Sequence, residues 1–173
     1  MRAAAVGTVV LVSALTAVAG CGAKTPTGSA PCAADDVKVD GAFGTKPTVT
    51  IPDTCTPPTQ LVIKDLSVGT GPAIKDGDAV DTDYHLVAWS DKTVLDSVWK
   101  GGPPQPYLVA PVGQATVIQG WNEGLIGQKQ GGRRLLIVPP NKGYGADPPS
   151  TQIKPNETLV FVIDAVKVTS ATG

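Results

Sequence analysis

The stretch Val117–Trp121, which reads VIQGW, decides the fold of this chain together with segments on either side of it. After it come Gly143–Ala146 (GYGA) and the apolar run Leu159–Ile163 (LVFVI). Upstream of it lie Asp78–Tyr84 (DAVDTDY) and Leu95–Ser97 (LDS). Each segment alone is a weak signal, and their order along the chain gives the pattern its weight.

Together these segments resemble the FKBP-type peptidyl-prolyl cis-trans isomerases, over about residues 57–170. In that family the V-I-x-G-W segment leads into the one helix and places its tryptophan on the floor of a proline-sized pocket. The Y-G-A turn supplies a tyrosine hydroxyl at the rim. The resemblance implies isomerase activity toward proline-containing segments, without a cofactor or a metal. It also implies macrolide binding, although Pro149 stands where drug-binding relatives often carry histidine.

Carried over residue by residue, the resemblance gives two sets of site residues. The expected catalytic residues are Tyr84, Asp96, Val117, Ile118, Trp121, Tyr144 and Phe161. The expected substrate-binding residues are Leu95, Tyr107 and Ile153, with Leu95 standing where the family commonly has phenylalanine. The basic residue that relatives often pair with the aspartate has no clear match, and Lys100 is the candidate for that role.

Hydrophobic periodicity predicts several short strands separated by Gly, Pro and Asp turns, and one helix near Gln119–Gly127. Within this helix Trp121 and Leu125 lie four residues apart, so they share a face that would pack into the concave side of a sheet. Gly120 and Gly124 weaken the helix by propensity, so burial has to hold it in place. The expected fold class is α+β, an antiparallel sheet curved around one short helix with an N-terminal strand extension.

The strand expected over Ala79–Trp89 sorts its side chains by a period of two. Tyr84 falls on the face turned toward the core, whereas Asp81, Asp83 and His85 fall on the other face, which we expect to be solvated. His85 is the only histidine, so a Ser-His-Asp or Cys-His set has no base in the right place. Isomerisation of a peptide bond needs no nucleophile, which agrees with the family resemblance.

The first twenty residues predict a signal peptide. Arg2 precedes the uncharged, apolar run Ala3–Gly20, and Leu15–Cys21 ends with small residues before a cysteine. This segment resembles a bacterial lipobox, in which Cys21 would receive a diacylglycerol group and the preceding peptide would be removed. The alternative is an uncleaved signal anchor. Lipidation predicts a protein anchored in the cell membrane on its extracytoplasmic side, with proline-containing segments of exported proteins as partners.

The predicted organisation has four parts: a signal peptide over 1–20, a lipidated flexible tether over 21–36, a strand extension over 37–56 and an isomerase domain over 57–170. Alternation in Val37–Val39 and Thr48–Ile51 predicts a hairpin in the extension. Outside the cytoplasm Cys32 and Cys55 are free to oxidise, which predicts a disulfide, with two unpaired thiols as the alternative.

Charge and composition exclude some classes of partner and of site. The chain has 14 basic and 15 acidic residues and no basic run, so nucleic acid is not an expected partner. Cys32 and Cys55 lack C-x-x-C spacing, so no metal site is expected. A second hypothesis comes from another class, a membrane-tethered binding module or holdase that grips proline-containing segments without catalysis. Leu95 in place of an aromatic residue and the altered loop around Trp99 favour it to some degree.

Overall fold

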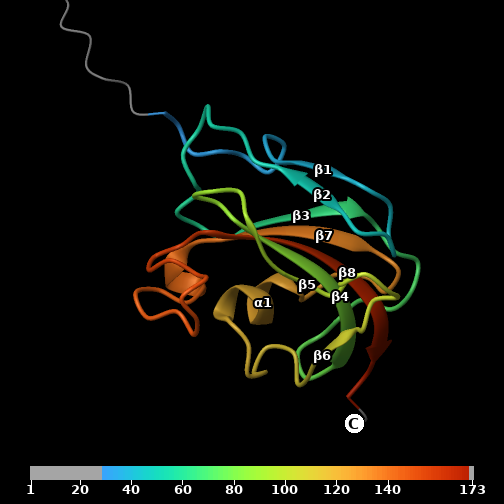
Figure 1. Cartoon of the computed structure of the whole chain (residues 1–173). Coiled ribbons are helices and arrows are strands. Elements are labelled where there is room, and N and C mark those ends of the chain that lie inside the picture. Colours follow the sequence, from blue (N-terminus) through green and yellow to red (C-terminus); the bar gives the residue numbers. More distant parts are fainter. Residues whose placement is uncertain (1–28, 172–173) are drawn as a thin grey trace, which may run out of the picture.

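An antiparallel sheet of six strands forms the body of the molecule in the computed structural model, which describes residues 29–171 (Figure 1). Neighbouring strands follow the order β3 (Val62–Ser67), β7 (Arg133–Val138), β8 (Leu159–Thr169), β4 (Ala79–Ala88) and β5 (Val94–Ser97), and β6 (Tyr107–Val109) also pairs with β4. β4 and β8 pair along the whole of β4, from Ala79 opposite Thr169 to Ala88 opposite Leu159. The 3-10 helix η1 (Pro140–Lys142) follows β7.

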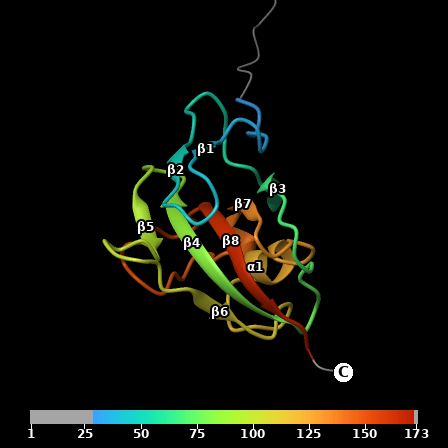
Figure 2. The same cartoon turned by 90° about the vertical axis from the view of Figure 1, so that its right-hand side faces the viewer.

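The helix α1 (Gln119–Gly124) lies against one face of this sheet (Figure 2). Trp121 and Leu125 enter the same core cluster as Leu136 of β7 and Phe161 of β8. The expected α+β fold, with an antiparallel sheet and one short helix, is therefore confirmed. The helix ends three residues earlier than predicted, because Gly127 adopts a positive φ of 78° in the turn toward β7.

The glycines of α1 allow the helix to approach β7 closely. A Cβ added to Gly120 would lie 2.5 Å from a methyl group of Val138, and one added to Gly124 would lie 2.7 Å from a methyl group of Leu136. The glycines thus cost helix propensity but permit the packing that buries Trp121.

Arg134 secures the carboxyl end of the same helix. Its Nη1 donates to the carbonyl oxygens of Gly124 at 2.7 Å and Ile126 at 2.9 Å, which satisfies acceptors that a helix end leaves free. The guanidinium is 2.7 Å from Asp65 on β3, so one buried arginine ties the helix end to the edge of the sheet.

The opposite face of the sheet is covered by the N-terminal extension, in which β1 (Lys38–Asp40) and β2 (Thr48–Thr50) form the predicted hairpin (Figures 1 and 2). Cys32 and Cys55 are joined by a disulfide with their Cα atoms 5.1 Å apart. A second core cluster lies between the extension and the sheet and contains Cys32, Val37, Ile51, Val87, Trp89, Leu135, Ile137, Val160 and Val162.

The extension begins earlier than the boundary at residue 37 that the sequence predicts. Pro31 pairs with Thr56 in a β-bridge, and Cys32 is buried. Part of the segment assigned to the tether therefore packs against the domain. Residues 1–20 and Cys21 lie outside the residues that the structure describes. In the described part of the chain no helix has the length and apolar character to span a bilayer.

The expectation that Asp83 and His85 face solvent is wrong. Asp83 is 4% exposed and His85 is 2% exposed, whereas Asp81 is half-buried. The ring nitrogen Nδ1 of His85 lies 3.0 Å from the hydroxyl oxygen of Ser97. Alternation along β4 assigned these residues to the correct face of the sheet, but the strand itself carries no sign that the extension covers that face.

We expect Gly120→Ala to lower the free energy of unfolding by about 1–2 kcal/mol, because the steric conflict with Val138 outweighs the gain in helix propensity. Urea unfolding measures the change. Gly102→Ala is the matched control, since a Cβ there meets nothing within 4 Å, and its effect should stay within about 0.5 kcal/mol. A Gly120→Ala protein that is more stable than the parent would contradict this packing argument.

Stability should also depend on the protonation of His85. Burial lowers the pKa of His85 from its ordinary value of 6.5, and the charges of Lys46 and Arg133 lower it further. The unfolded chain then binds more protons than the folded chain near that pH, so stability is present above the unfolded pKa and is lost as pH falls below it.

We therefore expect the free energy of unfolding to decrease as pH falls from about 7.5 to 5.5, and His85→Gln to flatten this dependence. Urea unfolding of both proteins at each pH measures the two slopes. Equal slopes in the parent and the variant would show that another group is responsible.

Candidate functional site

A cavity of about 570 Å³ opens on the face of the sheet that carries α1. Its walls come from β4, β5, β6 and β8, from the start of α1 and from the turn after η1. The lining residues are Tyr84, Leu86, Asp96, Tyr107, Thr116, Val117, Ile118, Gln119, Trp121, Gly143, Tyr144 and Phe161. We call it the aromatic cavity.

All of the expected catalytic residues line the aromatic cavity, and so does Tyr107. Leu95 and Ile153 do not line it. They line an adjoining cavity of about 610 Å³, which shares Leu86, Asp96 and Tyr144 with the first. The folded chain therefore brings the predicted site residues together, but they line two neighbouring cavities instead of one.

Four lining residues were missed from the sequence: Leu86, Thr116, Gln119 and Gly143. Leu86 could have been found, because it lies two residues after Tyr84 on the same strand face. Thr116, Gln119 and Gly143 adjoin or lie within the quoted motifs, and only the folded loops show that they face the cavity.

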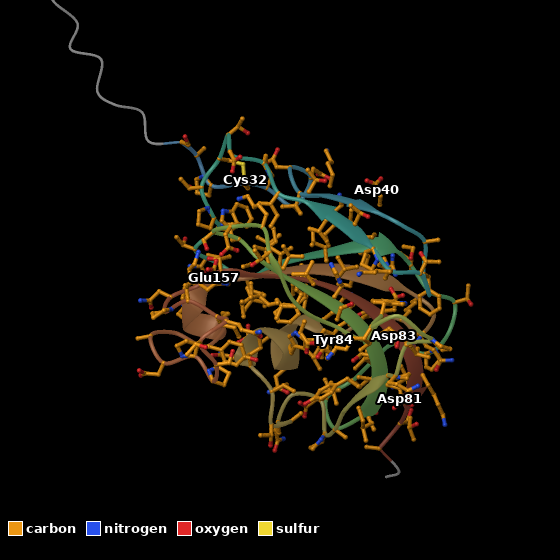
Figure 3. All side chains as sticks on the ribbon, viewed as in Figure 1. Cys32, Asp40, Asp81, Asp83, Tyr84 and Glu157 are labelled. Atoms are coloured by element: carbon orange, nitrogen blue, oxygen red, sulfur yellow. A yellow bond between two sulfur atoms is a disulfide. The ribbon has the colours of Figure 1, made fainter. Side chains whose placement is uncertain are left out.

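Trp121 forms the centre of an aromatic cluster at the base of the cavity. Its ring lies 5.3 Å from those of Tyr84 and Phe161 and 6.0 Å from that of Tyr107, each pair in an edge-to-face arrangement. Trp121 is only 4% exposed. Edge-to-face contacts fix the ring planes, so the base presents a rigid apolar surface. Figure 3 shows Tyr84 between β4 and α1, on the opposite side of the sheet from Cys32.

The segment before α1 is braced by Asn122. Its side-chain amide donates to the carbonyl oxygen of Ala115 at 3.0 Å and accepts from the Ala115 N–H at 3.1 Å. Ile118 is the N-terminal cap residue of the helix, in an extended conformation with φ −61° and ψ 151°. Its carbonyl accepts from the N–H of Trp121, while among the described residues no acceptor pairs with the Ile118 N–H. A backbone donor is thus available beside the aromatic floor.

Tyr84, Asp96 and Lys100 form a polar group at the rim. The hydroxyl of Tyr84 donates to Oδ2 of Asp96, and Lys100 Nζ lies 3.0 Å from Oδ1. Burial alone would raise the pKa of Asp96, but these contacts outweigh it and lower that pKa below its ordinary value. Lys100 therefore supplies the basic partner that was proposed for Asp96.

Tyr144 also lines the cavity and is 37% exposed. The turn that carries it is tight, because the N–H groups of Gly143 and Gly145 both donate to the carbonyl of Pro140. An ion pair of 2.7 Å between Lys142 and Glu123 links the same turn to α1. The turn that carries Tyr144 and the helix that carries Trp121 are thereby held at a fixed distance from each other.

The ionisable groups of the cavity keep one protonation state near neutral pH. The pKa of Asp96 is lowered, and burial raises the pKa of Tyr84 and Tyr144 above the ordinary tyrosine value. His85, the one histidine of the chain, projects from the other face of β4, and burial lowers its pKa from the ordinary value. The arrangement can enclose an apolar ring and offer hydrogen-bond donors, but it holds no group poised for proton transfer.

Comparisons with known proteins agree with this geometry. The family model for FKBP-type peptidyl-prolyl cis-trans isomerase matches residues 71–166. An FK506-binding protein of Streptomyces anulatus is 42% identical over 113 residues, which cover 65% of this chain and 89% of that protein. An FK506-binding protein of Neisseria meningitidis serogroup B is 36% identical over 109 residues, covering 62% of this chain and 95% of that protein.

A crystal structure of a peptidyl-prolyl cis-trans isomerase from Pseudomonas syringae pv. tomato aligns with a TM-score of 0.55 at 26% identity, over 64% of this chain and 76% of that one. The family match spans more than half of the sequence and includes every wall of the aromatic cavity. The chain therefore belongs to the FKBP-type peptidyl-prolyl cis-trans isomerases and is an enzyme of that class.

Proposed function

We propose that this isomerase assists the folding of exported proteins at the outer face of the cytoplasmic membrane, to which a lipid on Cys21 would tie it. The lipobox-like segment Leu15–Cys21 supports the anchor. The disulfide between Cys32 and Cys55 supports an oxidising compartment, because such bonds are rare in the cytoplasm.

The catalytic part of the proposal rests on one observation, the apolar cavity built around Trp121. Rotation about a peptide bond faces a barrier of about 18–20 kcal/mol, because the planar amide must give up its resonance. In the twisted state the carbonyl oxygen carries less negative charge and needs water less. A water-excluding cavity therefore stabilises the transition state more than the planar ground state.

Each side of the cavity has a distinct role in this mechanism. Trp121, Phe161 and Val117 hold the proline ring, with Tyr84 closing the cavity at its side. The Ile118 N–H and the Tyr144 hydroxyl orient the carbonyl groups on either side of the proline. Asp96 contributes a fixed negative charge whose position Tyr84 and Lys100 hold.

Macrolide binding is a second part of the proposal. The relatives from Streptomyces and Neisseria are named for binding FK506. The aromatic cavity offers an apolar floor of the kind that small-molecule sites use. Pro149 is exposed and offers no hydrogen-bond donor where drug-binding relatives often carry histidine, so any contact with the drug from this position is apolar.

The holdase hypothesis and the isomerase proposal differ in one measurable property. In a proline-limited refolding assay, an isomerase raises the rate of the slow phase at substoichiometric amounts, whereas a holdase does not. We expect acceleration by the soluble form that begins after Cys21. Acceleration only at stoichiometric amounts would favour the holdase.

Substitutions of residues that line the aromatic cavity test the role of each residue in the same refolding assay. Tyr144→Phe removes one hydrogen bond and keeps the apolar wall, so we expect kcat/KM to fall about two- to ten-fold. Trp121→Ala and Phe161→Ala should lower kcat/KM more strongly. Each can also cost about 3–5 kcal/mol of stability, so folding is checked by unfolding measurements before rates are compared.

The pH profile of the rate separates desolvation from proton transfer. Because the pKa of Asp96 is lowered and those of Tyr84 and Tyr144 are raised, the rate should be flat between about pH 5 and 8 as long as the protein stays folded. A bell-shaped profile that disappears in His85→Ala would show that desolvation is not the mechanism.

The anchor has its own test. Cys21→Ala should abolish lipid attachment and release the protein from the membrane fraction, because acyl chains rather than a spanning helix would hold it there. Mass spectrometry of the mature N-terminus measures the modification. A mature protein that begins at another residue and carries no lipid would remove the membrane part of the proposal and leave the isomerase activity untouched.

A further inference from the structure

The cavity that adjoins the aromatic cavity carries one charged residue, Lys46, that the isomerase mechanism does not use. We call it the flanking cavity. Two lysines line it, Lys46 and Lys100, and one carboxylate, Asp96. Leu95 and Ile153 give it an apolar wall, and it shares Leu86, Asp96 and Tyr144 with the aromatic cavity. A peptide whose proline lies in the first cavity can therefore continue into the second.

The charge balance of the flanking cavity favours an anion. Asp96 is already engaged by Lys100 at 3.0 Å, by the Tyr84 hydroxyl and by the Ser97 N–H at 2.8 Å. Lys46, in contrast, has no ion-pair partner among residues 29–171. Its ammonium group is the charge in this cavity that remains uncompensated, and the half-buried side chains of Leu95 and Ile153 line the same cavity.

Lys46 is brought to this cavity by the N-terminal extension. It lies in the loop between β1 and β2, and that loop is fixed from beneath by Arg133. The guanidinium donates to the carbonyl oxygens of Gly41 and Thr45, each at 2.7 Å, and the Gly44 N–H donates to Asp164 at 2.7 Å.

Arg133 also positions the opposite part of the wall, since its guanidinium carbon lies 5.9 Å from the ring centre of Trp99. Trp99 lines the flanking cavity beside Lys100. The buried Arg133 therefore contacts both the hairpin loop and Trp99, and so fixes two parts of the wall of the flanking cavity. The cavity is a built feature of this fold rather than a gap between mobile lysines.

We propose that the flanking cavity binds an acidic side chain near the target proline, with Lys46 as the residue that determines this preference. The inference rests on the isomerase function proposed above and adds a substrate class to it. The stem of a glutamate packs against Leu95 and Ile153 while its carboxylate faces Lys46. A basic side chain at the same place meets two lysines and is disfavoured.

The test uses three series of proline peptides that carry Glu, Gln or Lys near the proline, placed in turn on each side of it. With the purified protein at low salt, kcat/KM for the Glu peptide should exceed that for the Gln peptide by about two- to five-fold on one side of the proline. The Lys peptide should fall below both. The difference should appear in KM and should shrink at about 1 M salt, because the lysine is exposed.

Lys46→Gln should bring the ratio of Glu to Gln peptides close to one, and Lys46→Glu should reverse the order so that the Lys peptide is preferred. Lys129→Gln is the matched control, since Lys129 is an exposed lysine that lines neither cavity, and this variant should keep the parent ratio. It accounts for any effect of net charge alone.

Two kinds of failure can be told apart. Isomerisation of all peptides at equal rates, or an acidic preference that survives in Lys46→Gln, would overturn the assignment of Lys46 and leave the enzyme function intact. Failure to isomerise even the Gln peptide would instead overturn the proposed function on which this inference rests.

Discussion

The close contact between α1 and β7 is the constraint on which the site depends. A six-residue helix has little stability of its own, and two of its residues are glycine. It persists because Gly120 and Gly124 let it lie directly on Val138 and Leu136, and because Arg134 binds the carbonyls at its end. This position places Trp121 beneath Tyr84 and against Phe161. A larger residue at either glycine would lift the helix and open the floor of the cavity.

Successive side chains of a strand point to opposite faces of the sheet, so one face lines the aromatic cavity and the other binds the extension. On β4, Tyr84 and Leu86 face the aromatic cavity, while His85 and Val87 face the extension. The buried pair of Arg133 and Asp164, at 2.6 and 2.8 Å, lies on this second face and joins the extension to the sheet. A buried ion pair often contributes little net stability, but removing one partner costs about 3–5 kcal/mol. Its value here is geometric, because it specifies where the hairpin loop sits.

Features that depend on a local sequence pattern could be predicted from the sequence. Periodicity predicted the hairpin, β4 and the helix, and the family resemblance carried by the motifs around Trp121 and Tyr144 identified eight of the twelve residues that line the aromatic cavity. The sequence was insufficient where a distant segment decides the environment. His85 looks like a surface residue on an alternating strand, yet it is buried on the face of the sheet that residues 30–56 cover. Leu95 and Ile153 were assigned to one site with Trp121, but they line the flanking cavity, which shares Leu86, Asp96 and Tyr144 with the aromatic cavity.

The glycines of α1 show the same limit of local sequence patterns. Helix propensity treats Gly120 and Gly124 as a weakness, since propensity describes an isolated helix in water. In the folded protein the relevant quantity is the distance between the helix axis and β7, which no local pattern encodes. The extension presents a parallel case. Its two short strands lie far along the chain from Arg133, yet the guanidinium of Arg133 holds their loop, and Lys46 in that loop lines the flanking cavity. Residues outside the region that the family match covers can therefore contribute to substrate specificity in this enzyme. The buried Arg133 makes this possible, because its hydrogen bonds to Gly41 and Thr45 fix the loop that carries Lys46.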